Sequence, residues 1–188
     1  MNCYILIGGR SRRMGRPKEE LFLDRVARVA AEVFETVIAV QRNGGETAAI
    51  QTIYESPHDD QAPVFGVARA LEHARERCFI LAVDYPLISA AILRFLRERF
   101  ESSSAFLLAP FWSGKTQMLC GGYDPELLPR IEQRIAAKRY DLRGLASESE
   151  AEILAEDELR KMFDGEPLMN VNTVDDVKAI GFIEGDRS

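Results

Sequence analysis

The stretch Ile5-Leu6-Ile7-Gly8-Gly9-Arg10-Ser11-Arg12-Arg13-Met14-Gly15-Arg16-Pro17-Lys18 joins an apolar segment to a loop rich in glycine and cationic side chains. Glycine allows the backbone to approach a ligand closely, while backbone N–H groups and Arg or Lys side chains offset the charge of phosphate oxygens. The stretch matches neither the Walker A spacing nor the dinucleotide pattern Gly-x-Gly-x-x-Gly. We interpret it as a polyphosphate-binding loop of a third kind, placed after the first strand of the fold.

Strand and helix signals alternate beyond this loop. Apolar, β-branched runs predict strands, and apolar residues at helical spacing predict the helices between them. The expected strands are 2–7, 36–40, 51–54, 78–83, 105–109 and 118–123; the expected helices are 19–34, 64–74, one capped by Ser89 that runs to 100, one from Asp124-Pro125, and a last one opened by a Thr173/Asp176 capping box. We expect the polar run 147–158 to be loop or helix surface. This order predicts an α/β fold with a mostly parallel sheet between helices.

Composition is that of a globular protein expected to form a single domain, residues 1–188. The chain is 46% hydrophobic and 29% charged, with a net charge of −6. That charge argues against a nucleic-acid partner, because binding a phosphate polymer requires a broad basic surface. The apolar runs are too short for a membrane span, and no secretory signal is apparent, so we expect a cytoplasmic protein. Three widely separated cysteines, Cys3, Cys78 and Cys120, are expected to be buried free thiols.

Five segments, in the same order, resemble the MobA-like nucleotidyltransferase family. The run from Leu6 to Lys18 is similar to the family's signature loop Leu-x-Gly-Gly-x-Ser-x-Arg-Met-Gly-x-x-Lys. The later segments are Ala62-Pro63-Val64-Phe65-Gly66, Val83-Asp84-Tyr85-Pro86, Gln117-Met118-Leu119-Cys120 and Asn170-Val171-Asn172-Thr173. The resemblance implies a three-layer α/β/α Rossmann-like fold with a mostly parallel, mixed sheet. It also implies Mg²⁺-dependent transfer of GMP from GTP to the terminal phosphate of molybdopterin, and contact with other molybdenum-cofactor assembly proteins.

Asp84 ends the second strongly apolar strand. If that strand is parallel to the first, its carboxylate lies at the same sheet edge as the glycine-rich loop, where ligands of open α/β sheets bind. Mg²⁺ on a triphosphate needs one or two protein oxygens. An Asp two residues before Pro86 is equally typical of a turn or helix cap. The residues alone leave both readings open, and the resemblance favours the metal site.

The resemblance also implies roles for individual residues. Catalysis would depend on Arg13, Lys18 and Asp84, because nucleotidyl transfer needs positioning and charge neutralisation, not a covalent nucleophile. Asn170 and Asn172, two apart on an extended segment, would lie on one side and contact the acceptor, with Asn172 also binding the metal together with Asp84. The expected nucleotide-binding residues are Leu6, Ile7, Gly8, Gly9, Lys18, Gln41, Glu55, Gly66 and Asp84. Gln41 is a weak candidate for reading the base.

The chain departs from the family pattern at five positions, none of which removes a charge. Ile7 replaces a small residue, Ala62 a glycine, Met118 a proline and Val174 a proline. Glu55 stands where the family tends to have Asp, which keeps the carboxylate but lengthens its reach.

Three alternatives to a guanylyltransferase remain open. The cytidylyltransferase relative typically carries Leu-Ala-Ala-Gly where this chain has Leu6-Ile7-Gly8-Gly9, and Gly8 favours the guanine enzyme because an alanine methyl would occupy space near the nucleotide. A different acceptor, such as a sugar phosphate or phospholactate, would use the same fold. A non-catalytic nucleotide-binding partner in molybdoenzyme maturation is the third alternative, although such a protein would not need Lys18 and Asp84.

Overall fold

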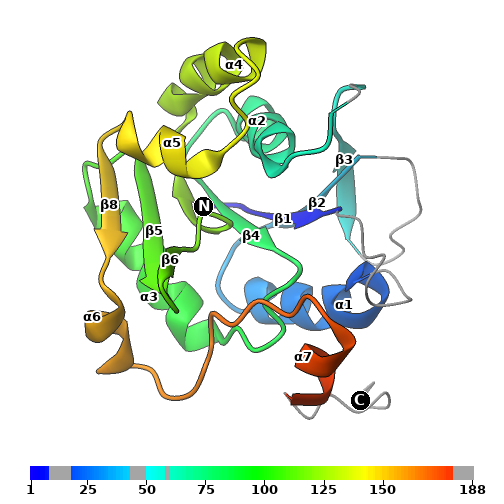
Figure 1. Cartoon of the computed structure of the whole chain (residues 1–188), viewed down its shortest axis with the longest axis vertical. Coiled ribbons are helices and arrows are strands. Elements are labelled where there is room, and N and C mark those ends of the chain that lie inside the picture. Colours follow the sequence, from blue (N-terminus) through cyan, green and yellow to red (C-terminus); the bar gives the residue numbers. More distant parts are fainter. Residues whose placement is uncertain (9–17, 43–49, 58–59, 180–188) are drawn as a thin grey trace.

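The computed structural model of the chain describes residues 1–8, 18–42, 50–57 and 60–179 (Figure 1). Within these ranges, eight strands form one sheet in the order β3-β2-β1-β4-β7-β5-β6, with β8 paired to β5. The strands are β1 (Cys3–Ile7), β2 (Val37–Gln41), β3 (Gln51–Tyr54), β4 (Cys78–Ala82), β5 (Leu107–Trp112), β6 (Lys115–Thr116), β7 (Cys120–Tyr123) and β8 (Ala151–Leu154). Neighbours among β3, β2, β1 and β4 are parallel, as are β5 and β8. β7 pairs antiparallel with both β4 and β5, and β6 pairs antiparallel with β5. The predicted mixed, mostly parallel sheet is confirmed.

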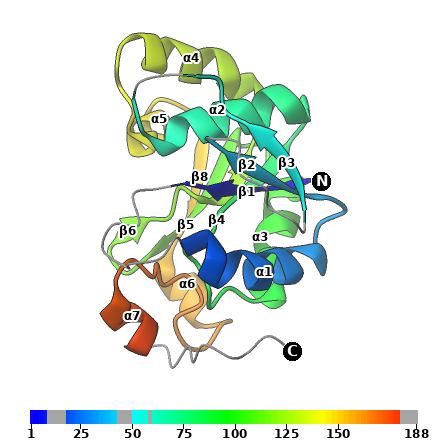
Figure 2. The ribbon, with the colours of Figure 1, turned by 90° about the vertical axis from the view of Figure 1, so that its right-hand side faces the viewer.

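Helices cover both faces of this sheet and make three layers (Figure 2). On one face lie α1 (Lys18–Ala31), α3 (Ala90–Ser102) and α6 (Glu156–Arg160), and on the other lie α2 (Pro63–Ala74), α4 (Leu128–Ala136) and α5 (Leu142–Ser147). The short η1 (Pro125–Leu127) leads into α4, and α7 (Val174–Ala179) packs on the α1 side. In the described part of the chain, no helix has the length and apolarity that crossing a bilayer requires.

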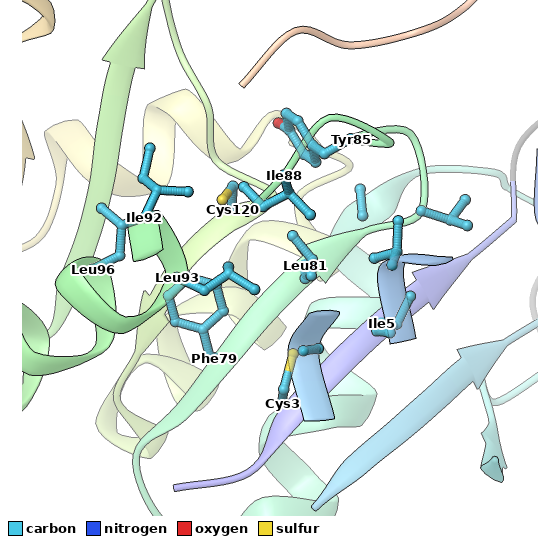
Figure 3. Close-up of a cluster of buried hydrophobic side chains, with 14 of the residues drawn as sticks. Cys3, Ile5, Phe79, Leu81, Tyr85, Ile88, Ile92, Leu93, Leu96 and Cys120 are labelled. Atoms are coloured by element: carbon cyan, nitrogen blue, oxygen red, sulfur yellow. The ribbon is translucent and has the colours of Figure 1, made fainter. Parts of the chain in front are cut away.

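The central strands are buried on both sides, which explains their continuous apolar sequences. All residues of β1 and β4 are buried. Alternate side chains serve opposite faces: Cys3 and Ile5 pack with Phe79 and Leu81 beneath α1 and α3 (Figure 3), whereas Tyr4 packs beneath α2.

One expectation for the C-terminal half is wrong. Residues 147–158, predicted to be loop or helix surface, contain β8, which pairs in parallel with β5. The run looks polar because Ser and acidic residues flank a strand of only four residues, in which Leu154 is buried at 2% exposure. Its strand conformation depends on hydrogen bonds to β5, a partner far away in the sequence. The short elements β6, α5 and α6 were not predicted either.

Both predicted helix caps are present. Ser89 caps α3, because its hydroxyl oxygen accepts a hydrogen bond from the Ile92 N–H at 3.5 Å. At α7 the Asp176 N–H donates to Thr173 Oγ1 at 3.1 Å, and the Thr173 N–H donates to Asp176 Oδ2 at 2.9 Å. This reciprocal capping box sets the point at which the chain turns into α7.

The three cysteines are buried free thiols, as predicted. Burial raises the pKa of Cys78 to about 12 and, with smaller contributions from nearby groups, raises the pKa of Cys3 and Cys120 above the ordinary thiol value. These thiols therefore stay protonated at neutral pH and act as small apolar core residues.

Candidate active site

The carboxyl ends of β1 and β4 lie side by side. Leu6 is opposite Ala82 in the parallel register, and the Val83 N–H donates to the Leu6 carbonyl oxygen at 3.3 Å. Gly8 follows Leu6 by two positions and Asp84 follows Ala82 by two. The start of the glycine-rich loop and the Asp84 carboxylate therefore leave the sheet at the same edge, as predicted.

The next two parallel strands end at this edge as well. Gln41, the last residue of β2, is opposite both Ile7 of β1 and Tyr54 of β3. Glu55 follows Tyr54 directly, and its N–H donates to the Gln41 carbonyl oxygen at 2.9 Å. Both candidate base-reading side chains, Gln41 and Glu55, thus stand beside the exit of β1.

Three of the predicted nucleotide-binding residues adjoin one another near the start of α2. Gly66 is buried in the first turns of this helix, after Pro63. A Cβ atom added at Gly66 would lie 3.0 Å from Glu55 Oε1 and 3.2 Å from Leu6 Cδ2. The glycine therefore allows a close approach between α2 and the ends of β1 and β3.

We expect Gly66→Ala to fold and to bind GTP about five- to tenfold more weakly, because relieving a contact this short costs on the order of 1 kcal/mol. The atoms it would displace are the ends of the Glu55 and Leu6 side chains. Isothermal titration calorimetry with GTP and Mg²⁺ measures the change. An unchanged affinity in a folded variant would contradict the placement of the nucleotide beside α2.

Gln41 carries a buried acceptor. Within the described residues, its Oε1 atom is buried and receives no hydrogen bond. Leaving a buried acceptor without a donor costs about 1–3 kcal/mol, so this side chain is suited to a ligand that brings an N–H group.

The segment that contains Asn170 and Asn172 passes directly beside Asp84. The Val171 N–H donates to the Asp84 carbonyl oxygen at 2.9 Å, and the Val171 side chain is fully buried. Asn170 is half-buried, and its Oδ1 atom accepts no hydrogen bond from any described residue. Asn172 is exposed, and its N–H donates to Asp176 Oδ2 at 2.9 Å. The structure thus brings Asp84 and the predicted acceptor-binding residues together.

A buried polar pair adjacent to Asp84 was not predicted as part of the site. The Tyr85 hydroxyl donates to Gln117 Oε1 at 3.1 Å, and Gln117 Nε2 donates to the Trp112 carbonyl oxygen at 2.9 Å. Burial raises the pKa of the Tyr85 hydroxyl well above its ordinary value, with smaller contributions from the neighbouring Cys120 and Asp84, and a hydrogen bond with Asn170 opposes the shift. The available signal was a glutamine in the otherwise apolar run Gln117-Met118-Leu119-Cys120.

Other predicted residues are only partly described. Gly9 and Arg13 lie outside the described residues, and for Lys18 only the backbone, which opens α1, is described. The Ile7 side chain is 2% exposed in the core beneath α1, which leaves its backbone for ligand contact.

Gly8 requires glycine for a backbone reason. Its φ angle is +152°, a conformation that residues with a Cβ atom rarely adopt. No described atom lies within 4 Å of a Cβ placed there. Crowding by the protein therefore does not explain this glycine, and Gly8→Ala would strain the backbone in addition to any effect on base choice.

The departures from the family pattern are compatible with the local backbone. Ala62 precedes α2 with φ −152°, in the extended region that any residue adopts. Val174 opens α7, at the helix position that also favours proline. Met118 contributes its carbonyl oxygen to a bond from the Tyr123 hydroxyl at 2.6 Å, which a proline would provide equally.

The oxygen donors at this edge suit Mg²⁺. Among the described residues, no group of three or more His, Cys, Asp or Glu side chains is placed to hold a metal. Asp84 and the buried Asn170 Oδ1 supply two hard oxygens. Mg²⁺ commonly takes one or two protein oxygens and completes its octahedral shell with phosphates and waters, so these residues fit the ion when a triphosphate is bound with it.

The chain is similar to known proteins along almost its whole length. The family model described as MobA-like NTP transferase domain matches residues 3–153. An Aquifex aeolicus protein named "Probable molybdenum cofactor guanylyltransferase" is 30% identical over 193 residues, covering 97% of this chain and 90% of the relative. A crystal structure of an Aquifex aeolicus protein superimposes with a TM-score of 0.76 at 26% identity, covering 92% of this chain and 93% of that one.

A more distant structure shows the same fold. Molybdopterin-guanine dinucleotide biosynthesis protein A from Archaeoglobus fulgidus superimposes with a TM-score of 0.81 at 22% identity, covering 95% of this chain and 96% of that one. The match of the family model, the full-length sequence similarity and the three-layer fold agree with one another. The chain belongs to the MobA-like NTP transferase family and is a nucleotidyltransferase.

Proposed function

We propose that this nucleotidyltransferase transfers GMP from GTP to the terminal phosphate of molybdopterin. An oxygen of that phosphate forms a bond to the α-phosphorus of GTP, while the bond from the α-phosphorus to the bridging oxygen of pyrophosphate breaks. The products are molybdopterin guanine dinucleotide and pyrophosphate. The name of the Aquifex aeolicus relative, a probable molybdenum cofactor guanylyltransferase, supports this choice of substrates.

The observation that carries the proposal is the hydrogen bond from the Val171 N–H to the Asp84 carbonyl oxygen, 2.9 Å long. It joins the segment of Asn170 and Asn172 to the strand end that stands beside the exit of β1. Leu6 packs with α2, the helix of Gly66, and Val171 packs in the core beneath α1, so the candidate nucleotide and acceptor residues approach Asp84 from opposite faces of the sheet. In-line transfer requires this arrangement, since the α-phosphate must meet the acceptor phosphate between them.

The chain's own groups act by positioning and charge. Asp84 and Asn170 would hold Mg²⁺. Asn170 takes the ligand role expected for Asn172, because its Oδ1 atom is buried and accepts no hydrogen bond from a described residue, whereas Asn172 is exposed and would contact the acceptor. Mg²⁺ bound there would offset charge on the α-phosphate and on the departing pyrophosphate. Arg13 and Lys18 would neutralise the rest of the triphosphate charge. The attacking phosphate is already an anion, so the reaction needs no side-chain nucleophile, and the described cysteines, which are buried and protonated, take no part.

Guanine would be read by Gln41 and Glu55. Guanine presents N–H donors on its amide and amino edge, and these suit the buried Gln41 Oε1 and the Glu55 carboxylate. CTP and ATP lack N–H donors at these two positions of guanine, which costs about 1–3 kcal/mol for each hydrogen bond that is not made. The longer Glu55 replaces the Asp of the family without loss of the charge.

We expect a preference for GTP over CTP and ATP of about a hundredfold or more, the result of two hydrogen bonds that only guanine makes. Gln41→Met should reduce that preference by about tenfold, because it removes one of them. Side-by-side transfer assays with each nucleotide and molybdopterin measure the ratio. Gln51→Met, at the exposed start of β3, is the matched control and should keep the parent ratio. Equal use of CTP by the parent protein would contradict the guanylyl assignment.

Pyrophosphate release separates the classes of function. With GTP and Mg²⁺, a transferase releases pyrophosphate only when molybdopterin is added. Release with CTP in place of GTP would indicate the cytidylyltransferase alternative, and release with a sugar phosphate or phospholactate in place of molybdopterin a different acceptor. Binding of GTP with no release under any condition would indicate a non-catalytic partner protein.

A further inference from the structure

Three consecutive residues, Asp84, Tyr85 and Pro86, are each held by a different part of the fold. The Asp84 carbonyl oxygen accepts from the Val171 N–H at 2.9 Å, the Tyr85 hydroxyl donates to Gln117 Oε1 at 3.1 Å, and the Pro86 carbonyl oxygen accepts from Arg25 Nε of α1 at 2.5 Å. Tyr85 and Pro86 are both buried. The loop that carries Asp84 is therefore fixed from three directions.

Gln117 is the most constrained of these anchors. It is 3% exposed, and it and Arg134 are the buried polar or charged residues among those described. Its side-chain oxygen accepts from Tyr85, and its Nε2 donates to the Trp112 carbonyl oxygen at 2.9 Å. Its backbone N–H donates to the Pro110 carbonyl oxygen at 2.8 Å. A buried amide with both ends bonded has one allowed orientation, which it imposes on its partners.

The connection continues from Trp112 to the asparagine segment. Trp112 Nε1 donates to Glu166 Oε2 at 2.9 Å, and the Arg160 guanidinium lies 4.1 Å from the centre of the Trp112 ring. The Met169 N–H donates to the Glu166 carbonyl oxygen at 3.1 Å, directly before Asn170. Hydrogen bonds therefore connect Tyr85, next to Asp84, to Gln117, Trp112 and Glu166 in turn. Glu166 is bonded to the segment that contains Val171, and Val171 is bonded to Asp84, so the network is closed.

We propose that Gln117 is a positioning residue that, through Tyr85 and Trp112, holds the Asp84 carboxylate and the Asn170 amide at the separation a divalent cation needs. This inference rests on the proposed function, in which Asp84 binds the metal. Residues that orient metal ligands typically change metal affinity by about 10–100-fold when removed. Gln117 touches no reacting atom; it acts on Asp84 through the Tyr85 hydroxyl.

The test is a double-mutant comparison of Tyr85→Phe, Gln117→Met and the double variant. Mn²⁺ binding is followed by electron paramagnetic resonance in the presence of GTP, and stability by urea unfolding of the same samples. Tyr85→Phe and Gln117→Met each leave one member of the Tyr85–Gln117 bond unpaired, whereas the double variant removes both members and should regain part of the stability. The Trp112 carbonyl oxygen loses its Gln117 donor in both Gln117 variants. We expect the Mn²⁺ dissociation constant to rise about tenfold in Gln117→Met and to stay raised in the double variant.

Tyr4→Phe is the matched control. Tyr4 is a fully buried tyrosine of β1 whose hydroxyl shares a hydrogen bond of 2.9 Å with His73 Nδ1 beneath α2, on the face of the sheet opposite α1. Its loss should lower stability and leave the Mn²⁺ dissociation constant at the parent value. A purely structural role for Gln117 predicts that Mn²⁺ affinity follows stability across all four variants, and that result would overturn the inference.

Asp84→Asn separates this inference from the proposed function. If Asp84→Asn retains the parent Mn²⁺ affinity, the metal assignment itself is wrong and the inference falls with it. If Asp84→Asn loses Mn²⁺ while the double variant binds it normally, the metal assignment stands and only the positioning role of Gln117 is overturned. If Gln117→Met does not fold, the double variant carries the comparison.

Discussion

Asp84→Asn is expected to lower the rate of GMP transfer by about 10²–10³-fold, the loss typical when a preorganised electrostatic group is removed from an active site. The substitution replaces an anionic oxygen ligand with a neutral amide of nearly the same shape. It leaves the main-chain bond in place, because the Val171 N–H donates to the carbonyl oxygen of residue 84, not to its side chain. Transfer of labelled GMP at saturating GTP and Mg²⁺ measures the rate.

Asp124→Asn is the control for this substitution. Asp124 is also half-buried, but it follows Tyr123, whose partner Cys78 is the first residue of β4, so it lies at the opposite end of that strand from Asp84. It pairs with Arg77 Nε at 3.3 Å, so its loss should lower the thermal midpoint while transfer continues at the parent rate. Near-parent turnover of Asp84→Asn at limiting Mg²⁺ would refute the metal assignment.

Lys18→Ala is expected to lower kcat by about a hundredfold and to raise KM for GTP much less, because negative charge builds on the pyrophosphate as it leaves. A fixed ammonium group stabilises that charge more in the transition state than in the ground state. Lys18 opens α1, the helix whose Arg25 donates to the Pro86 carbonyl oxygen beside Asp84. The helix that Lys18 opens is thereby tied to the same loop.

Steady-state kinetics with varied GTP separate the two parameters for this variant. Lys115→Ala removes an exposed lysine from β6 and should leave both kcat and KM unchanged. If Lys18→Ala raises KM and keeps kcat, the lysine binds the ground state and its role in the transition state is wrong.

The strands that carry the site could be predicted because an uninterrupted apolar sequence indicates a buried strand without knowledge of its neighbours. β1 and β4 are apolar at every position, and a strand buried on both faces must be. Ligands of open α/β sheets bind beyond the carboxyl ends of the parallel strands, and this rule predicted that Gly8 and Asp84 would lie at the same edge. The same local logic predicted the capping box of Thr173 and Asp176, which needs only two residues three apart.

The contacts between distant segments could not be predicted from the sequence, because hydrogen bonds between these segments depend on which strands become neighbours. Residues 147–158 were predicted to be polar surface, because the strand β8 within them is stabilised by pairing with β5 and not by a local sequence pattern. The position of Glu55 against Gly66 needs α2 and β3 to pack, and the bond between Tyr85 and Gln117 needs β4 and the turn before β7 to meet.

The sequence by itself determined the fold class, the order of most of the elements and the candidate residues of the glycine-rich loop and of Asp84, because composition, periodicity and short motifs are local properties of the chain. The tertiary structure alone decided how those residues are arranged. It placed the Asn170 segment against Asp84 through the Val171 bond, and it buried Gln117 between Tyr85 and Trp112. These arrangements follow from burial, since polar groups withdrawn from water must find partners wherever the packed sheet brings them.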